Sequence, residues 1–434
     1  MKKQAPKLIA ISLLITLAAL MAVAAWIPEK ESTSSLAGEQ GNEFKPDPDP
    51  PADDNEQETP PAEEPVVPFT PIPPEASALY RYTQSLWAEG GVELNGVHQT
   101  SEGTFAVITH SGKEGALNVG GKRTLSVVKL ESDGTVSALK HLAGGDVYLD
   151  SRLTSDGLAV AACDDGRSYI HTLSLDLKSD VMLELNRFTS AELFALSDGY
   201  LLFTSGTDNN VYAVSDNVVK ATGSVIAGEI FAVYDFAVYY MLVIGGISGY
   251  SVVKIDISDA SLRTLSTVTI PDKQILNVSP YVENGVQKFL AVEKNANGVE
   301  VVKYDASFTV DEERVGVGLA DAAEAYMNGN SILLLLHATS TRLYIIDGNL
   351  NFTASNSDLM RGVTSIHDCI CYENGYVCLY SAGDKLTMCE IGNDGKTVTR
   401  NLAVTTSAAY LTRDTDGKCA VFYASDDSLK IIGV

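Results

Sequence analysis

Short runs of alternating apolar and polar residues, each ended by a tight turn, recur from residue 76 to the end of the sequence. The clearest example runs from Ser365 to Val404 and contains four such runs, separated by Asn374-Gly375, Gly383-Asp384 and Asp394-Gly395. Alternation with a period of two is typical of β-strands, and Gly, Asn and Asp tolerate the positive φ angles of hairpin turns. This segment is therefore predicted to be a four-stranded antiparallel meander.

The same arrangement repeats with a spacing of about 45 residues, the period of a four-stranded propeller blade. The first turn of each repeat falls at Gly103, Gly157, Gly199, Phe236, Gly285, Gly329, Gly375 and Gly417. No stretch has a sustained helical period. The predicted fold class is therefore all-β, with residues 76–434 forming an eight-bladed β-propeller of four-stranded blades.

The last repeat contains three predicted strands, so one strand of that sheet must come from elsewhere. The run Ala78–Trp87 is strand-like and belongs to no meander of its own. Pairing it with Leu429–Val434 closes the ring and removes an exposed sheet edge. We predict that this N-terminal strand completes the final blade.

The repeated meander resembles eight-bladed β-propellers in general, and is most similar to the bacterial quinoprotein-like and outer-membrane-assembly types. Trp26 and Trp87 are the only tryptophans, so the sequence lacks the tryptophan-docking repeats of quinoprotein dehydrogenases, and it also lacks WD dipeptides. The resemblance therefore implies a fold and transfers no catalytic residue.

Residues 1–27 are predicted to be a membrane anchor or a signal peptide. Lys2, Lys3 and Lys7 precede an uncharged run from Leu8 to Ile27, which as a helix is long enough to cross a bilayer with its N-terminus in the cytoplasm. Small residues at Ala22-Val23-Ala24 leave the alternative of a cleaved leader. The predicted location is the cell membrane, single-pass with the C-terminal domain outside the cytoplasm, or secreted if the leader is removed.

Residues 28–75 are predicted to be a disordered linker. They hold 12 of the 15 prolines and 13 acidic residues against two lysines. Proline removes backbone donors, like charges repel, and little apolar surface is available for burial. A tether is favoured over a proline-rich peptide ligand.

The charge of the whole chain excludes one class of partner. The formal net charge is −25 and the apolar fraction is 45%. Nucleic-acid binding requires Lys and Arg to neutralise phosphates, so no nucleic-acid partner is expected, while the apolar fraction suffices for a large core.

Five of the six cysteines lie in the last two repeats. A two-residue turn at Asn374-Gly375 pairs Cys371 with Cys378, and one at Gly383-Asp384 pairs Cys378 with Cys389. The three thiols then form a row across one blade, which suits a disulfide or a thiol metal site in an exported protein. Because Cys371 and Cys378 are then a hydrogen-bonded pair inside a packed face, buried reduced thiols are the favoured interpretation.

The candidate binding residues lie in predicted loops on one face of the ring: His110, Asp164, Asp165, Arg167, Asp208 and Asn209. The aspartates suit a calcium ion or a basic partner, but their spacing matches no calcium loop. No two histidines have a metal-ligand spacing, so no metal, cofactor or catalytic residue is predicted.

The sequence favours a non-catalytic binding or scaffolding module, exported and tethered to the membrane by its N-terminal helix. The expected partner is an envelope protein or a cell-wall glycan. The alternative is a polysaccharide hydrolase or lyase with acidic residues in the propeller funnel. A transmembrane sensor is disfavoured, because only seven residues precede the apolar run.

Overall fold

The computed structural model describes residues 71–72, 82–114, 117–205, 210–226, 228–258, 260–308, 310–338, 340–356, 362–383, 385–402, 404–414, 416–425 and 427–434. These residues form β-strands and connecting turns, so the predicted all-β class is confirmed. Within these ranges no helix is long and apolar enough to cross a membrane. The predicted anchor, residues 1–27, lies outside the described residues.

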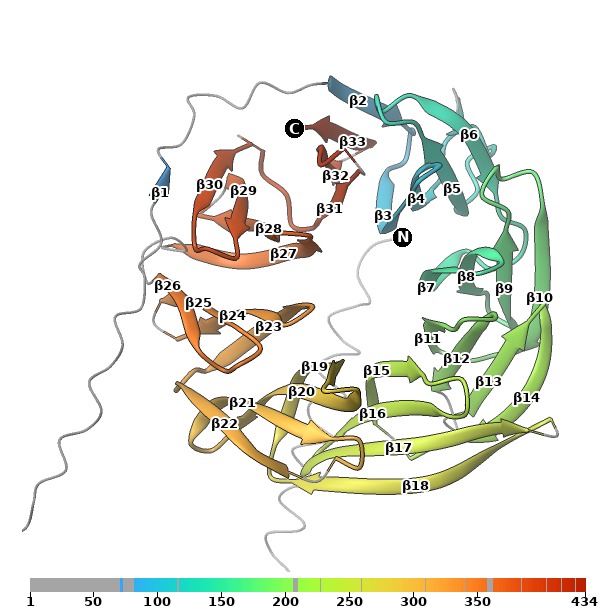
Figure 1. Ribbon diagram of the computed structural model, residues 1–434. Coiled ribbons are helices and arrows are strands. Elements are labelled where there is room, and N and C mark those ends of the chain that lie inside the picture. The colour runs from blue at the N-terminus through green and yellow to red at the C-terminus, as the bar shows by residue number, and fades with distance from the viewer. Residues whose placement is uncertain are drawn as a thin grey trace, which may run out of the picture. The chain divides into compact units, whose positions relative to one another are not determined.

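The strands group into consecutive four-stranded units (Figure 1). Unit 1 consists of β3 (Val92–Thr100), β4 (Gly103–His110), β5 (Thr124–Leu130) and β6 (Val136–His141). Unit 2 consists of β7 (Val147–Thr154), β8 (Gly157–Cys163), β9 (Arg167–Leu173) and β10 (Asp180–Asn186). Unit 3 consists of β11 (Ser190–Ala195), β12 (Tyr200–Ser205), β13 (Asn210–Ser215) and β14 (Val218–Ser224), and unit 4 of β15 (Glu229–Asp235), β16 (Tyr240–Gly246), β17 (Gly249–Ser258) and β18 (Ser261–Pro271).

Units 5 to 8 follow the same order. Unit 5 consists of β19 (Gln274–Glu283), β20 (Val286–Asn295), β21 (Gly298–Asp305) and β22 (Val310–Gly318). Unit 6 consists of β23 (Ala322–Asn328), β24 (Ser331–His337), β25 (Thr341–Ile346) and β26 (Phe352–Asn356). Unit 7 consists of β27 (Val363–Tyr372), β28 (Gly375–Ala382), β29 (Lys385–Gly392) and β30 (Thr397–Asn401), and unit 8 of β31 (Ala409–Arg413), β32 (Cys419–Ser425) and β33 (Ser428–Gly433) with β2 (Tyr82–Trp87).

Each unit is an antiparallel meander, and its first turn falls at the position that the repeat predicted. Units 3 and 4 share one eight-stranded sheet, because β14 and β18 meet in a short parallel pairing at Thr222 and Ser261. The predicted four-stranded repeats are therefore confirmed, with one outer-edge fusion that the pattern did not indicate.

The second strand of a unit is buried on both faces, as β8 shows. All seven of its residues are buried. Leu158, Val160 and Ala162 pack in a cluster with unit 1, whereas Ala159 and Ala161 pack in a cluster with unit 3. Since successive side chains of a strand point to opposite faces, a continuous apolar run is what a sheet between two other sheets requires.

Eight such hydrophobic clusters join the units within residues 63–434, one at each junction between consecutive units. The last junction packs unit 8 against unit 1, so the units form a closed cycle with the first strand of each innermost (Figure 1). Burial of these faces stabilises sheets that are too small to persist singly.

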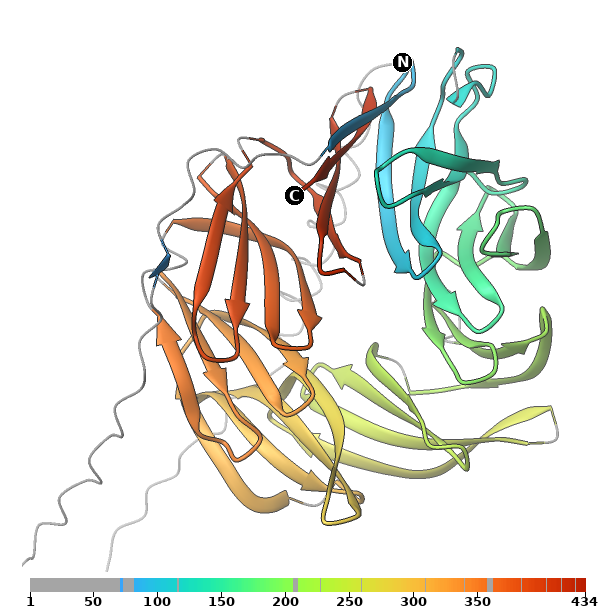
Figure 2. The same cartoon turned by 45° about the horizontal axis from the view of Figure 1, so that its top comes forward.

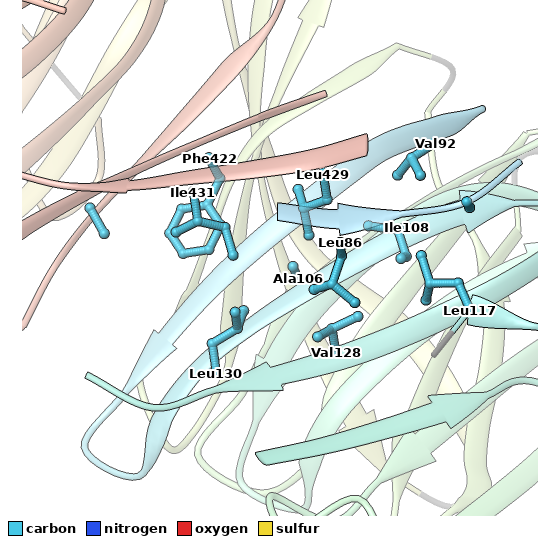
Figure 3. Close-up of a cluster of buried hydrophobic side chains, with 12 residues drawn as sticks. Leu86, Val92, Ala106, Ile108, Leu117, Val128, Leu130, Phe422, Leu429 and Ile431 are labelled. Carbon is cyan, nitrogen blue, oxygen red and sulfur yellow. The ribbon is translucent and has the colours of Figure 1, made fainter. Parts of the chain in front are cut away.

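The predicted closing strand is confirmed. Strand β2 pairs antiparallel with β33 from Tyr82–Gly433 to Trp87–Ser428, and the two strands lie side by side in both views (Figure 1, Figure 2). Leu86 of β2 and Leu429 of β33 then pack into the cluster that joins unit 8 to unit 1 (Figure 3). At the end of the pair, the Trp87 indole Nε1 donates a hydrogen bond of 2.6 Å to Asp427.

Part of the predicted linker is ordered on the sheet. Pro71–Ile72 forms β1, which pairs in parallel with β30 through Thr397 and Val398. The prediction of a disordered linker over residues 28–75 stays a prediction, because the other residues of this segment lie outside the described ranges. The outer edge of unit 7 offers unpaired backbone groups that an extended chain can satisfy.

The predicted pairing of Cys371 with Cys378 is wrong. Tyr372 pairs with Gly375, so the two-residue turn is Glu373-Asn374 and Gly375 already belongs to β28. Cys369 therefore faces Cys378, and Cys371 faces Tyr376. The pairing of Cys378 with Cys389 is confirmed. All six cysteines lie within the described residues as free thiols.

Candidate functional site

One face of the cycle carries the connection between the second and third strand of each unit and the connection to the next unit. We call it the loop face. His110 ends β4 on this side, and Asp164 and Asp165 lie between β8 and β9. Asp208 and Asn209 lie outside the described residues. The four candidates within the described residues thus lie on the loop face, in two separate units.

His110 is buried in a chain of hydrogen bonds within unit 1. Its Nε2 lies 2.8 Å from the Ser126 hydroxyl, which lies 2.8 Å from Nδ1 of the exposed His141. Burial, reinforced by the charge of His141, lowers the pKa of His110 to about 4. His110 is therefore neutral near pH 7. Because its imidazole is already hydrogen-bonded to Ser126, it is not free to bind a partner.

Asp164 shapes the turn in which it lies. Its Oδ1 accepts hydrogen bonds from the backbone N–H groups of Gly166 and Arg167, at 2.7 and 2.8 Å, and its Oδ2 accepts one from the Tyr169 hydroxyl. The two backbone hydrogen bonds and the tyrosine lower the pKa of this carboxyl. An Asp that bonds backbone groups two and three residues on is a common turn residue.

Arg167 and Asp165 differ in what they face. Arg167 forms an ion pair with Glu184 across β9 and β10. Asp165 lines a pocket of about 870 Å³ together with Asp146 and Arg187. The structure thus brings Asp164, Asp165 and Arg167 into one hairpin. Asp164 lines the same pocket as Asp165, but both of its carboxylate oxygens accept hydrogen bonds within the hairpin.

A larger pocket lies between units 4 and 5 on the same face, with a volume of about 1,140 Å³. The turns of β16–β17 and β20–β21 and the connection from β18 to β19 surround it. Ile247, at the tip of the first of these turns, is fully exposed. Ile247 is thus an apolar side chain at the rim of the pocket, available to a partner that covers the loop face.

Beneath this pocket, Glu293 is fully buried and held by three donors. The Tyr250 hydroxyl and the Tyr304 hydroxyl, the latter at 2.6 Å, donate to its Oε1, and Lys273 Nζ donates to its Oε2 at 2.5 Å. Lys273 also lies 2.6 Å from Glu300. A buried carboxylate is stable only when paired and hydrogen-bonded in this way.

Lys273 connects this buried network to the pocket. Its side chain is 17% exposed and lines the pocket. Burial lowers the pKa of Lys273, but its hydrogen bonds to Glu293 and Glu300 outweigh that effect and raise it. The ammonium group is therefore charged and fixed in position, which preorganises the base of the pocket.

Two acidic residues on the innermost strands accept backbone hydrogen bonds from the next unit. Asp150 follows a bulge in β7, and its Oδ2 accepts a hydrogen bond of 2.6 Å from the Leu193 N–H of the next unit. Asp368 follows a bulge in β27 and accepts one of 2.8 Å from Leu411 in the same manner. Both carboxylates join neighbouring innermost strands, so their positions are explained without catalysis.

Of the similar solved structures described here, Sqt1 supports the fold. The yeast protein Sqt1 of Saccharomyces cerevisiae has a similar structure with a TM-score of 0.55 at 10% identity, covering 80% of this chain and 97% of that one. The designed protein Ika8 gives a TM-score of 0.49 at 11% identity, covering 80% and 98%. A prolyl endopeptidase gives 0.49 at 10% identity, covering 76% of this chain and 54% of its own length.

At these identities the likeness to Sqt1 concerns the fold alone, which is propeller-like. This chain spans about half of the prolyl endopeptidase chain. No protein-family model matches the sequence, and no curated protein sequence matches it.

The hydrogen-bond network of Glu293 was not predicted from the sequence. In β20, Phe289, Ala291 and Glu293 alternate on one face, and the first two are plainly apolar core residues. That alternation was a signal that Glu293 points inward. Its partners come from three other strands or turns, which no local pattern could bring together.

Proposed function

We propose that this chain is a non-catalytic binding or scaffolding module that holds a partner on its loop face, at the pocket between units 4 and 5. The observation that carries the proposal is the combination of a large pocket, a fully exposed Ile247 and a lysine fixed by a buried ionic network. A rigid ring supplies the platform, and its loops supply the specificity.

The chemistry of this pocket favours a protein partner over a glycan. Ile247 presents an exposed aliphatic side chain at the rim of the pocket. Phe231 is the aromatic side chain that lines the pocket, and it is half-buried. An exposed apolar side chain is stabilised when the apolar surface of a protein partner covers it.

The cellular setting is part of the same proposal. The uncharged run in residues 1–27 and the acidic, proline-rich residues that follow suit an exported domain tethered to the membrane. The partner would then be a protein of the cell envelope.

The proposal is tested by comparing two aspartate substitutions in affinity capture from envelope extracts. Ile247→Asp changes the loop face, and Val238→Asp is the matched control, because Val238 is 76% exposed in the β15–β16 turn on the opposite face of the same unit. We expect the partner captured by the wild type to be lost with Ile247→Asp and retained with Val238→Asp. Equal capture by both variants, or capture by residues 28–75 alone, contradicts the proposal.

A further inference from the structure

Cys369 and Cys378 face each other across the first two strands of unit 7. Cys369 lies on the innermost strand β27 and Cys378 on β28, and their Sγ atoms are 2.8 Å apart. A disulfide bond is 2.03–2.05 Å long, so the two sulfurs need to approach by only about 0.8 Å to reach bonding distance.

The observed register also gives this pair the backbone geometry that a disulfide needs. A two-residue turn is closed by a hydrogen-bonded pair, here Tyr372 with Gly375, and the two pair types alternate along the hairpin. Cys369 and Cys378 are therefore a non-hydrogen-bonded pair, whose Cα atoms lie about 4.5 Å apart, inside the range that disulfides span.

Cys378 has a second neighbouring thiol, Cys389, on its other side. The turn after Ala382, which pairs with Lys385, makes Cys378 and Cys389 a hydrogen-bonded pair by the same alternation. Cys389 instead contacts Thr399, whose hydroxyl lies 3.6 Å from its sulfur. The geometry thus distinguishes between two possible partners of Cys378 and selects Cys369.

We propose that Cys369 and Cys378 form an oxidation site, at which a reversible disulfide joins β27 to β28. A thiolate of the pair attacks a disulfide oxidant, small-molecule or protein, and displaces one thiol from it. The second thiolate then attacks the mixed disulfide and displaces the other thiol. The two cysteines lose two protons and two electrons, and the oxidant is reduced to two thiols.

The same surroundings determine when this reaction occurs. Cys378 is fully buried, and burial raises the pKa of the Cys369 thiol, so few thiolates exist in the folded domain. Strand β27 has two bulges just before Cys369, between Val363 and Ser365 and between Ile366 and Asp368, and these interrupt its pairing with β28. Oxidation is therefore expected during folding, before β27 is packed, and slowly afterwards.

The proposal depends on the register of unit 7 and is independent of partner binding at the loop face. The test uses the purified full-length chain, unfolded and refolded in a glutathione redox buffer. Remaining thiols are alkylated, and the chain is cleaved after Glu373 and after Lys385, which separates Cys369 from Cys378 and Cys378 from Cys389. Fragmentation of each linked peptide between Cys369 and Cys371 distinguishes these two neighbours. Mass spectrometry then identifies any linked peptides.

We expect two of the six thiols to escape alkylation, a linked pair that contains Cys369 and Cys378, and recovery of all six thiols with dithiothreitol. Cys389→Ser should leave the link intact, whereas Cys378→Ser should abolish it. The oxidised chain should also melt a few degrees higher than the reduced one. Six alkylated thiols after oxidative refolding, or a link of Cys378 to Cys389 or Cys371, overturns the proposal.

Discussion

Acid is expected to destabilise this domain through two histidines, the half-buried His98 and the buried His110. His98 Nε2 lies 2.7 Å from the Ser151 hydroxyl, between units 1 and 2. Burial, with a smaller effect from Arg152, lowers the pKa of His98 to about 4. His110 is lowered to about 4 by burial and by His141. The ordinary histidine pKa is 6.5.

The direction in which stability changes with pH follows from proton binding by the folded and unfolded chains. Below pH 6.5 the unfolded chain takes up protons at these positions, whereas the folded chain does not until about pH 4. The stability contributed by the neutral histidines is complete above pH 6.5 and is lost progressively as the pH falls towards 4. At pH 5 the loss is about 2 kcal/mol for His98. For His110 we use about 1 kcal/mol, because part of its shift comes from the charge of His141, which is solvent-exposed and therefore screened by water.

The assay is denaturant unfolding at pH 8 and pH 5 for the wild type and for His98→Gln/His110→Gln. Glutamine keeps a hydrogen-bonding group but does not titrate, and the pH 8 comparison isolates the cost of altered packing. Carboxylates contribute equally to both proteins and cancel. The wild type should lose about 3 kcal/mol more than the double variant between the two pH values. An equal loss in both proteins refutes the reasoning.

Three further substitutions have defined outcomes. Gly157→Ala should destabilise the domain by about 3 kcal/mol in chemical unfolding, because Gly157 has φ +132° and an added Cβ would lie 2.0 Å from the Leu173 carbonyl oxygen; unchanged stability would contradict this. Asp368→Ala should cost about 2 kcal/mol in the same assay by leaving the Leu411 N–H without its acceptor. Glu293→Ala should cost about 3 kcal/mol or more, measured as a lower thermal midpoint, since it leaves buried donors unpaired; a neutral result would show that water replaces the carboxylate.

The repeat and its closure could be predicted because they depend on local residues. Glycine, asparagine and aspartate recur at the first turns, and the apolar strands between them alternate or run continuously according to how many faces are covered. The strand at Tyr82–Trp87 was recognisable because the last unit lacked a fourth strand.

The cysteine register could not be fixed in this way. Both Glu373-Asn374 and Asn374-Gly375 are acceptable two-residue turns by composition, and moving the turn by one residue changes every pair in the hairpin. Gly375, with φ +158°, begins β28 because its missing Cβ lets the strand pass close to the Ile391 carbonyl oxygen. That contact comes from the third strand and is not visible in the turn itself.

The candidate site was predicted only in part for a related reason. The repeat indicated which residues lie between the second and third strands of a unit, so Asp164, Asp165, Arg167 and His110 were expected on the loop face, where the structure has them. Which loop residue is free depends on partners that the repeat does not reveal. His110 is held by a hydrogen bond across strands, Asp164 by hydrogen bonds within its own turn, and Arg167 by an ion pair with the next strand.

The proposed binding function depends on the closed ring, because the ring holds the loops of units 4 and 5 on one fixed face. Ser85 and Lys430 are paired residues of β2 and β33, 345 positions apart in sequence, with Lys430 Nζ 2.9 Å from the Ser85 hydroxyl. The most direct test is Ser85→Cys/Lys430→Cys, oxidised and mapped by mass spectrometry. We predict a disulfide between the two engineered positions, and we expect it to stabilise the domain by up to about 5 kcal/mol. Free thiols at both positions in a folded, oxidised sample would contradict the closed ring.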